Sequence, residues 1–562
     1  MKKILMLLTA LLAVAGLAQD RVVERTYLST DRDVYVAGET LWYSAFCLDA
    51  AKGTLTTVSS VAYVELHDAE KMVASGKVAL LNGRGAGQLT IPGSLPTGNY
   101  RLVVYTSQNK AEQGYDYNGL ASKTVSVFNV FSGDRVKDGV ELVDAEEYER
   151  CRIKSVIPGP DRASLNVVWR DSVLEVTNNG ASRATFSLSV THDDGFASNG
   201  NPTIADFTAQ ARRVGPRSFD NSILPDFEGE IIRGHISGFS EEILPKLLGK
   251  FAFISTPSTK SDVYSSVIDT DGKVAFFTGN IYGTKEYICE IEGIDPSLNC
   301  FIELESPFVN AKVAAPEKLR MSESLREPLR ARSVAMQIER HFTSDTLLDP
   351  LSVRQCGLFG EHEIVYHLDD YTRFTTMEEV LIEFVAEMRA RRRSDGSRDI
   401  QVRLSEIASN PIFSSGSALM MLDGVPVFDH EKIMQYDPLL VESIDIYPHT
   451  HFIGNRIFEG VVNFVTYKRN LPSFRFDANA RVIDYQGVCV PMAFTGASIP
   501  EDGSYPDYRQ TIYWHPLVEV GAGENRPVQV RFPQYKGRFT AVAEGMTASG
   551  EAVVRRISFE VR

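Results

Sequence analysis

Residues 29–42 read STDRDVYVAGETLW. A polar cluster leads into the run Val34-Tyr35-Val36, and Gly38 separates that run from Thr40-Leu41-Trp42. Short runs of this kind, alternating with polar residues and divided by Gly and Pro, continue to about residue 130. The pattern predicts short strands that pair in an antiparallel β-sandwich.

The same stretch resembles the macroglobulin-type domain of the alpha-2-macroglobulin family, in which a Thr-Asp-Arg/Lys turn, a Tyr and a Gly-Glu pair lead into a strand. The later run Leu95–Leu102 resembles the Pro-x-Gly-x-Tyr-x-Leu strand entry of that domain. The resemblance implies a sandwich over residues 19–131. It does not extend to protease trapping, because the sequence has no thioester run of the Cys-Gly-Glu-Gln type.

The amino terminus has the pattern of a secretory signal peptide. Lys2 and Lys3 precede an apolar run over residues 4–17, and Gly16 and Ala18 supply the small residues of a cleavage site. The run is shorter than the roughly 20 residues of a spanning helix. We therefore expect residues 1–18 to be removed on export, with the mature chain in the periplasm or at the outer membrane of a Gram-negative cell. No later stretch predicts a transmembrane segment.

Length and charge narrow the class of protein. A chain of 562 residues is long enough for about three to five domains, each with its own core. The formal net charge of -15 argues against nucleic acid as a partner, because the field of the whole chain would repel a polyanion. No spacing of Ser, His, Cys or carboxylates predicts a catalytic, cofactor-binding or metal site, so we expect no enzyme and no cofactor.

Two further β-rich segments are expected, at residues 132–222 and 223–314, each a sandwich of its own. The second resembles the carboxypeptidase-regulatory type of sandwich. A helical connector is expected at residues 315–344, because Val334, Ile338 and Phe342 recur at helical spacing.

The second of these segments contains a disulfide candidate. Cys289 and Cys300 lie on two β-like runs joined by a turn, so a hairpin would place them opposite each other. An exported protein permits such a bond. Two small buried thiols are the equally acceptable alternative.

Residues 345–470 alternate between helix-like and strand-like pieces, which predicts an α+β domain. The pieces are a helix from Thr376, strands at 400–404, 418–422 and 425–427, a short helix at 430–436, and strands at 441–446 and 460–466. The Asp423-Gly424 pair between two apolar runs is a strong hairpin signal.

This domain resembles the plug domain of TonB-dependent outer-membrane transporters. The residues that carry the resemblance are Asp423, Gly424, Glu442, Ser443, Asp445 and Gly460. In that family the plug fills a barrel. Only 94 residues follow Lys468, fewer than the strands of a 22-stranded barrel need, which is on the order of 200 residues. We therefore expect the domain to dock or bind and not to transport.

Two charged features complete the prediction. The basic run at residues 389–393 is expected to be a solvated helix end. In the tail, residues 471–562, strand-like runs predict an Ig-like β domain in which Asp507 and Arg509 pair while neighbouring aromatics pack a core. A ligand site in that tail is the alternative.

The sequence as a whole predicts a mainly β protein, with several Ig-like or macroglobulin-like sandwiches and one α+β plug-like domain. The leading hypothesis is a non-catalytic accessory or scaffold that docks on an outer-membrane barrel or on a transport or assembly machine. The alternatives are a periplasmic or surface module that binds peptide or glycan, and a macroglobulin-like inhibitor without a thioester.

Overall fold

The structure is a computed structural model of the whole chain. It describes residues 21–119, 122–155, 164–170, 172–238, 242–258, 262–295, 297–342, 348–353, 359, 364–394, 396–405, 412–414, 418–500 and 504–562. The predicted signal peptide lies outside these residues. Within them, no helix has the length and apolar character required to cross a membrane.

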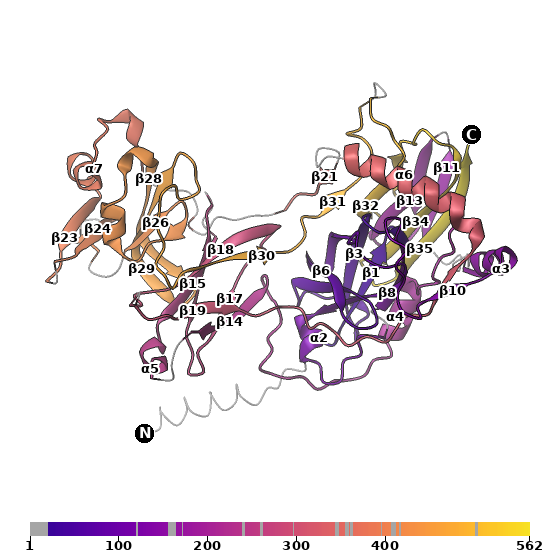
Figure 1. Cartoon of the computed structure of the whole chain (residues 1–562), viewed down its shortest axis with the longest axis horizontal. Helices are drawn as coiled ribbons and strands as arrows, with labels where there is room; N and C mark the ends of the chain where they lie inside the picture. The colour runs from indigo at the N-terminus through magenta and orange to yellow at the C-terminus, as the bar shows by residue number, and fades with distance from the viewer. Residues whose placement is uncertain are drawn as a thin grey trace. The chain divides into compact units, whose positions relative to one another are not determined.

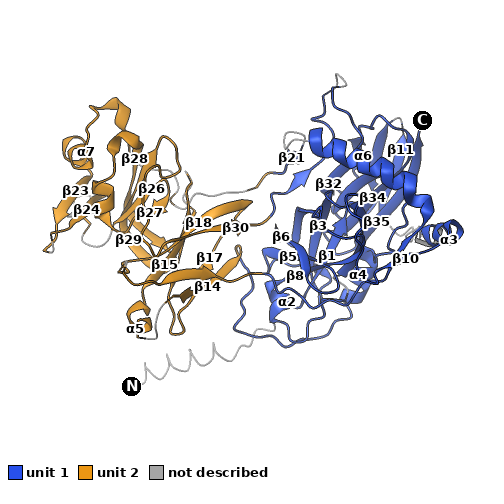
Figure 2. Ribbon diagram, viewed as in Figure 1, with its two compact units in different colours: residues 1–227, 308–351, 489–562 blue, residues 228–307, 352–488 orange. Residues whose placement is uncertain are grey.

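The protein is mainly β, as predicted. Its strands fall into two compact units, drawn in blue and orange in Figure 2. Unit 1 comprises residues 1–227, 308–351 and 489–562, and unit 2 comprises residues 228–307 and 352–488. Each unit is therefore assembled from segments that are far apart in the sequence.

The first sandwich of unit 1 confirms the fold predicted for the amino-terminal domain. One sheet has β1 (Glu24–Thr30), β3 (Thr40–Asp49), β4 (Thr54–Leu55) and β7 (Arg84–Thr90). The other has β2 (Val34–Val36), β9 (Ser122–Phe128), β8 (Gly98–Thr106), β5 (Val61–His67) and β6 (Met72–Ala79). Alternate residues of both sheets, among them Leu41, Tyr43 and Val64, are fully buried between them.

The expected separation of residues 132–222 from the carboxyl-terminal domain 471–562 is wrong, because their strands share sheets. One sheet has β11 (Leu165–Arg170), β12 (Val173–Asn178) and β33 (Asn525–Gln529). The other has β32 (Thr511–Val520), β13 (Ala184–His192), β34 (Gly537–Thr547) and β35 (Ala552–Val561). Their inner faces form one core, since Phe186 and Val190 pack with Ile512 and Phe539.

Shorter elements complete unit 1. They are α2 (Ser107–Ala111), α3 (Ala145–Ser155), α4 (Ile204–Ala211), α6 (Arg326–Phe342), and the paired strands β10 (Val140–Leu142) with β20 (Leu319–Met321) and β21 (Asp349–Pro350) with β31 (Met492–Ala493). The helix α6 confirms the expected helical segment. Val334 and Phe342 are about half exposed, whereas Arg332 and Met336 are buried.

Unit 2 contains the sandwich predicted for residues 223–314, with one added strand. One sheet has β17 (Lys273–Phe277), β14 (Ile231–Ser237) and β19 (Phe301–Leu304). The other has β16 (Asp262–Val267), β15 (Phe251–Thr256), β18 (Thr284–Ile291) and β30 (Arg481–Gln486). The short helix α5 (Leu244–Leu247) lies between β14 and β15 in the chain.

The predicted hairpin for the two cysteines is wrong. Cys289 lies on β18 and Cys300 precedes β19, and these strands belong to different sheets. Both residues are free thiols buried in the core between the sheets. The two β-like runs are strands, as the sequence pattern predicted. They do not pair with each other, because β18 pairs with β15 and β19 pairs with β14.

The plug-like segment has every predicted helix and strand. Its main sheet has β22 (Ile364–His367), β28 (Val441–Ile453), β29 (Arg456–Thr466), β26 (Leu419–Leu422) and β27 (Val425–Pro426). A smaller sheet has β23 (Met388–Arg392), β24 (Arg398–Leu404) and β25 (Ile412–Phe413), and the helices are α7 (Met377–Glu383) and α8 (His430–Met434). Figure 1 labels α7, β23, β24, β26, β28 and β29 of this segment, which lie together in the picture.

Candidate functional site

Asp423 of the plug-like motif is buried, and its carboxylate accepts hydrogen bonds from the end of β29 and the residues after it. It occupies the first position of the two-residue turn between β26 and β27, with φ of 49°, and Gly424 follows with φ of 86°. The Asp423 carboxylate accepts hydrogen bonds from the backbone N–H of Thr466 at 2.7 Å, its hydroxyl at 2.7 Å and the N–H of Leu471 at 2.8 Å. The turn therefore fastens the end of β29.

The two glycines of the motif are explained by close packing. A Cβ on Gly424 would stand 2.5 Å from the carbonyl oxygen of Ser258. A Cβ on Gly460, whose φ is 89°, would stand 2.9 Å from the Cβ of Val402. Both positions combine a left-handed backbone with a near neighbour, so only glycine fits without strain.

The remaining motif residues lie along β28. Glu442 forms an ion pair with Arg469 at 3.3 Å, and Ser443 donates a hydrogen bond to Asp445 at 2.8 Å. The structure thus distributes the six motif residues over the turn, β28 and β29 and does not bring them together. Each has a local role, Ser443 in a hydrogen bond within β28 and Glu442 in a half-exposed ion pair.

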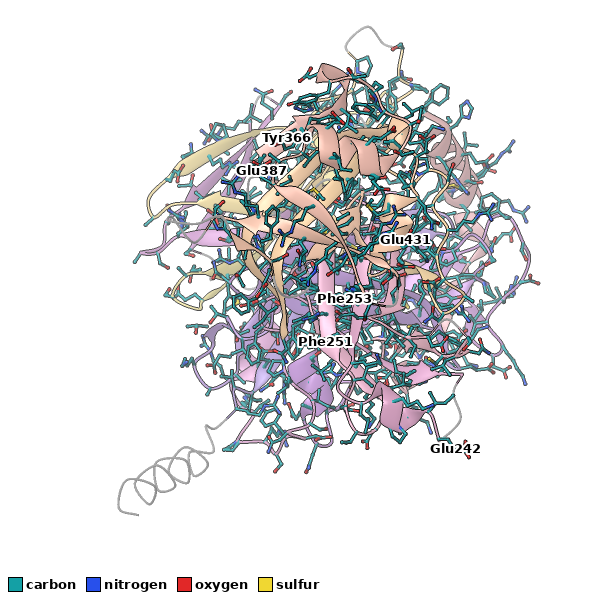
Figure 3. All side chains as sticks on the ribbon, turned by 90° about the vertical axis from the view of Figure 1, so that its left-hand side faces the viewer. Glu242, Phe251, Phe253, Tyr366, Glu387 and Glu431 are labelled. Carbon is teal, nitrogen blue, oxygen red and sulfur yellow. The ribbon has the colours of Figure 1, made fainter. Side chains whose placement is uncertain are left out.

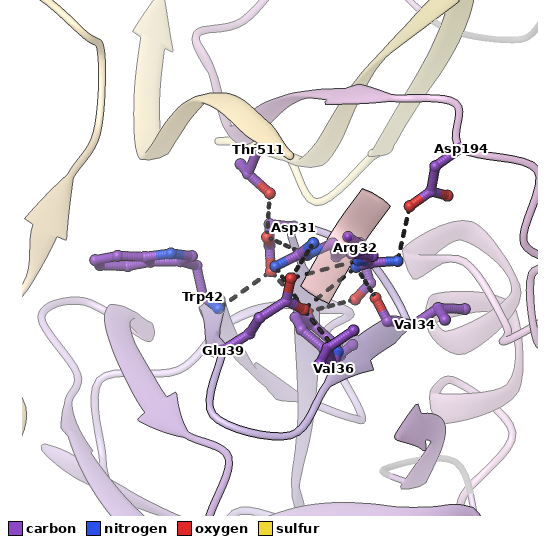
Figure 4. A network of polar contacts seen from close by, with 10 residues as sticks. Asp31, Arg32, Val34, Val36, Glu39, Trp42, Asp194 and Thr511 are labelled. Carbon is purple, nitrogen blue, oxygen red and sulfur yellow. Dashed lines mark hydrogen bonds and ion pairs between the residues drawn. The ribbon is translucent and has the colours of Figure 1, made fainter. Parts of the chain in front are cut away.

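A network of buried polar and charged side chains in unit 1 includes Asp31, Arg32 and Glu39 (Figure 4). Asp31 accepts hydrogen bonds from the Thr511 hydroxyl at 2.6 Å, the Tyr35 hydroxyl at 2.6 Å and the Trp42 N–H at 3.1 Å. Arg32 contacts Asp31 at 3.4 Å and Glu39 at 3.2 Å. Asp31, Arg32 and Glu39 all belong to residues 29–42, so the stretch that carries the macroglobulin resemblance supplies the central residues of this network.

Arg332 connects α6 to this network. Its guanidinium donates to Glu39 at 3.3 Å, to Asp194 at 2.9 Å and to the carbonyl oxygen of Val34 at 2.6 Å. Only 3% of the side chain is exposed, so the ion pairs are shielded from water. Three distant segments are held together at this point.

Burial and the neighbouring charges shift the pKa values of the acids in different directions. Burial raises the pKa of Asp31, although Arg32 acts against it. For Glu39, burial is outweighed by Arg32 and Arg332, and its pKa is lowered. Burial and the nearby Glu39 raise the pKa of Glu339, on α6, to about 7. These shifts follow from packing between segments that are distant in the sequence.

Sequence reasoning missed Arg332 as a member of the buried face. The signal that could have found it is the spacing of Leu325, Leu329 and Met336, which lie three or four residues from one another or from Arg332. An apolar stripe with one arginine inside it indicates a buried ion pair when acidic partners are present elsewhere. Those partners, Glu39 and Asp194, are not local in sequence.

An aromatic surface lies around α7 in unit 2. Tyr371 stacks on Phe384 with 4.3 Å between ring centroids and 2° between the planes, and the Phe374 ring centroid lies 6.3 Å from that of Phe384. Tyr371 is 42% exposed, and Ile382 of α7 is 73% exposed. Figure 3 shows Tyr366 close to Glu387, whose carboxylate accepts the Tyr366 hydroxyl hydrogen bond. We name Tyr366, Tyr371, Phe374, Ile382 and Phe384 the α7 surface.

A small pocket of about 190 Å³ also lies in unit 2. Apolar side chains, including Leu419, Met420 and Phe428, line part of it. Arg393, Asp399 and His430 line another part; the Asp399 carboxylate lies 2.9 Å from both the Arg393 guanidinium and the His430 ring. The hydrogen bond from His430, together with Arg393, lowers the pKa of Asp399.

The basic run at residues 389–393 is not a helix end. The helix α7 ends at Glu383, and the arginines lie on β23 and directly after it. Pairing with β24 holds them in extended conformation. In the tail, Asp507 and Arg509 pair as predicted, at 2.6 Å, with Trp514 buried nearby. Among the described residues, no group of three or more His, Cys, Asp or Glu side chains is placed to hold a metal ion.

Comparison with known proteins supports the amino-terminal domain. Residues 25–122 match the family model of the MG2 domain, which agrees with the predicted macroglobulin-type sandwich. No curated protein matches the chain. The match ends well before the plug-like segment, whose resemblance to TonB-dependent transporters stays a prediction.

Solved structures of bacterial macroglobulins align with the chain at low similarity. The native conformation of alpha-2-macroglobulin from E. coli is 9% identical with a TM-score of 0.25, and covers 97% of this chain and 40% of that chain. Salmonella alpha-2-macroglobulin reacted with methylamine is 8% identical with a TM-score of 0.23, at 97% and 40% coverage. The chain thus spans about 40% of the length of these proteins.

Proposed function

We propose that this chain is a non-catalytic protein of the Gram-negative cell envelope, acting as an accessory or scaffold. In this proposal unit 1 is a rigid body that includes the MG2 domain, and unit 2 docks on an outer-membrane barrel protein. The predicted signal peptide supports export. The plug-like order of elements in residues 345–470 supports an outer-membrane partner.

The observation that carries the docking proposal is the α7 surface. Interface cores are enriched in aromatic residues, and stacked rings such as Tyr371 and Phe384 present a large rigid area at low entropic cost. Ile382 of α7 is a further exposed apolar side chain. Substitution of central aromatics in protein interfaces weakens binding by about 2 kcal/mol or more.

The test is co-purification from solubilised outer membranes with the tagged full-length chain. A barrel protein is expected with the native chain and is expected to be lost with the double variant Tyr371→Ser, Ile382→Ser. The control is Tyr508→Ser, which replaces a 37% exposed tyrosine in unit 1 and is expected to leave recovery unchanged. Recovery of the native chain as a free monomer would refute the proposal.

A second candidate is a module that binds peptide or glycan. The pocket beside Asp399 and Phe428 favours it, because small ligand sites combine apolar lining with a few placed polar groups. A ligand screen by thermal shift tests this candidate, since binding to the folded state raises the melting temperature.

A further inference from the structure

Strand β23 has an open edge. It is the end strand of the order β23-β24-β25, and Figure 1 shows it on the outer side of β24. The ladder with β24 runs from Met388, opposite Val402, to Arg392, opposite Arg398. Among the described residues, no strand pairs with the other side of β23. Backbone groups on that side are free to pair with an added strand.

The register identifies the free backbone groups. Bonds from the Arg393 N–H to Ser397 and from the Arg403 N–H to Glu387 flank the ladder. In an antiparallel ladder the residues that bond to the partner alternate with those that face away from it. Residues 389 and 391 therefore bond to β24, whereas Ala390 and Arg392 direct their N–H and C=O groups outward. The Met388 N–H is taken by Val385.

The side chains make this edge positive. Arg389, Arg391 and Arg393 lie on one face by strand alternation, about 7 Å apart. Arg389 donates to Gln401 at 2.9 Å, and Arg393 pairs with Asp399 at 2.9 Å. Arg391 and Arg392 are exposed and make no side-chain hydrogen bond or ion pair within the described part of the chain. In a chain of net charge -15, this is a local concentration of positive charge.

We propose that the free edge of β23 binds an extended acidic segment of another protein as an added strand. The backbone of that segment pairs with Ala390 and Arg392. Its carboxylates, at alternate positions, lie on the face of Arg391, the exposed arginine of this face that has no side-chain partner within the described residues, with Arg389 and Arg393 on either side of it at the two-residue repeat of a strand. Main-chain bonds then supply affinity and alternate side chains supply specificity.

The charge pattern selects against a second copy of the chain. Pairing of β23 with itself would set arginines against arginines, and like charges opposite each other destabilise a sheet. A nucleic acid would satisfy the guanidinium groups but would leave the outward N–H and C=O groups of Ala390 and Arg392 without strand partners. The proposal does not depend on docking through the α7 surface, so the two can succeed or fail separately.

The experiment measures fluorescence anisotropy of labelled eight-residue peptides with the full-length protein. A peptide of alternating Glu and Thr is expected to bind, and a peptide of alternating Lys and Thr is not. Two N-methylated versions of the peptide are compared, one methylated at every Glu and one at every Thr. Only one of these two sets of N–H groups faces β23 in the added strand, so one version is expected to lose binding and the other to keep it. This readout leaves the protein unaltered.

Protein variants locate the site. Arg391→Glu is expected to weaken binding of the Glu-Thr peptide roughly tenfold or more, as loss of a charge-assisted hydrogen bond predicts. Ala390→Pro removes an outward N–H without breaking the ladder to β24 and is expected to weaken binding similarly. Arg475→Glu, an equal charge change at an exposed position of the same unit, is the control and is expected to have little effect.

Three results would overturn the proposal. The first is no binding of the Glu-Thr peptide by the native protein. The second is equal affinity for a peptide with four consecutive Glu residues or for a single-stranded oligonucleotide, which would indicate charge attraction alone. The third is insensitivity to N-methylation at both sets of positions.

Discussion

Arg332 and Glu39 form a buried ion pair, although 293 residues separate them in the sequence. Nε and Nη2 of Arg332 each lie 3.3 Å from one carboxylate oxygen of Glu39. The pair connects α6 to the loop between β2 and β3, in the stretch that resembles the macroglobulin family. Because both side chains are only 3% exposed, neither can exchange its partner for water. The relationship makes the stability of unit 1 dependent on three separate segments.

Arg332→Ala is expected to lower the free energy of unfolding of unit 1 by about 3–5 kcal/mol, because it leaves Glu39 buried without one of its cations. The matched control is Arg326→Ala on the same helix. Arg326 pairs with Glu323, and both side chains are more than 70% exposed, so the expected loss is within about 0.5 kcal/mol. Denaturant unfolding measures both. Equal losses of unfolding free energy in the two variants would show that the buried ion pair does not account for the effect of Arg332→Ala.

Glu339→Gln is expected to stabilise unit 1 above pH 7. The pKa of Glu339 is raised from its ordinary 4.5 to about 7, by burial first and by Glu39 second. The folded state therefore holds this proton more tightly, and its stability falls as pH rises from about 4.5 to 7. The variant cannot ionise. Its melting temperature should exceed that of the native chain by roughly 2–4 °C at pH 8.

The same comparison below pH 4.5 should give no difference, since Glu339 is then protonated in both states. Glu327→Gln, on the exposed side of α6, is the control at each pH. A gap between Glu339→Gln and the native chain that stayed constant with pH would exclude ionisation of Glu339 as its cause.

Asp423→Ala is expected to destabilise unit 2 by about 3 kcal/mol or more. It removes the acceptor of three hydrogen bonds and leaves the donors of Thr466 and Leu471 buried without it. Glu442→Ala, in the same motif, breaks only a half-exposed ion pair with Arg469 and should cost less than about 1 kcal/mol. Urea unfolding followed by circular dichroism distinguishes the two; similar costs would contradict the assigned roles.

Cys289 is expected to alkylate slowly in the native protein at pH 8 and rapidly after unfolding. Burial raises the pKa of its thiol to about 12, so at pH 8 the side chain is almost entirely protonated. Alkylation requires the thiolate, which is the nucleophile. Mass spectrometry of native and urea-treated samples measures the modification at this residue. A non-reduced digest that contained Cys289 linked to Cys300 would show a bonded pair in place of the free thiols.

Features that depend on neighbouring residues were predicted correctly from the sequence. The Asp423-Gly424 turn has the two positive φ angles that its residue types favour, and Asp507 pairs with Arg509 two positions away. Local periodicity also predicted a helix within residues 315–344 and strands at 441–446 and 460–466, which the structure contains as α6, β28 and β29, the two strands being longer than predicted. The sequence alone therefore determined the mainly β class, the order of elements and the tight turns.

Strand partners were decided only by the tertiary structure. Strand β13 pairs with β32 and β34, which lie more than 300 residues later, and this joins two segments expected to fold apart. Every strand offers the same backbone donors and acceptors, so an alternating pattern predicts a strand without naming its partner. The inward position of Arg332 and the extended conformation of residues 389–392 have the same origin, because each depends on contacts with residues that are distant in the chain or across a sheet.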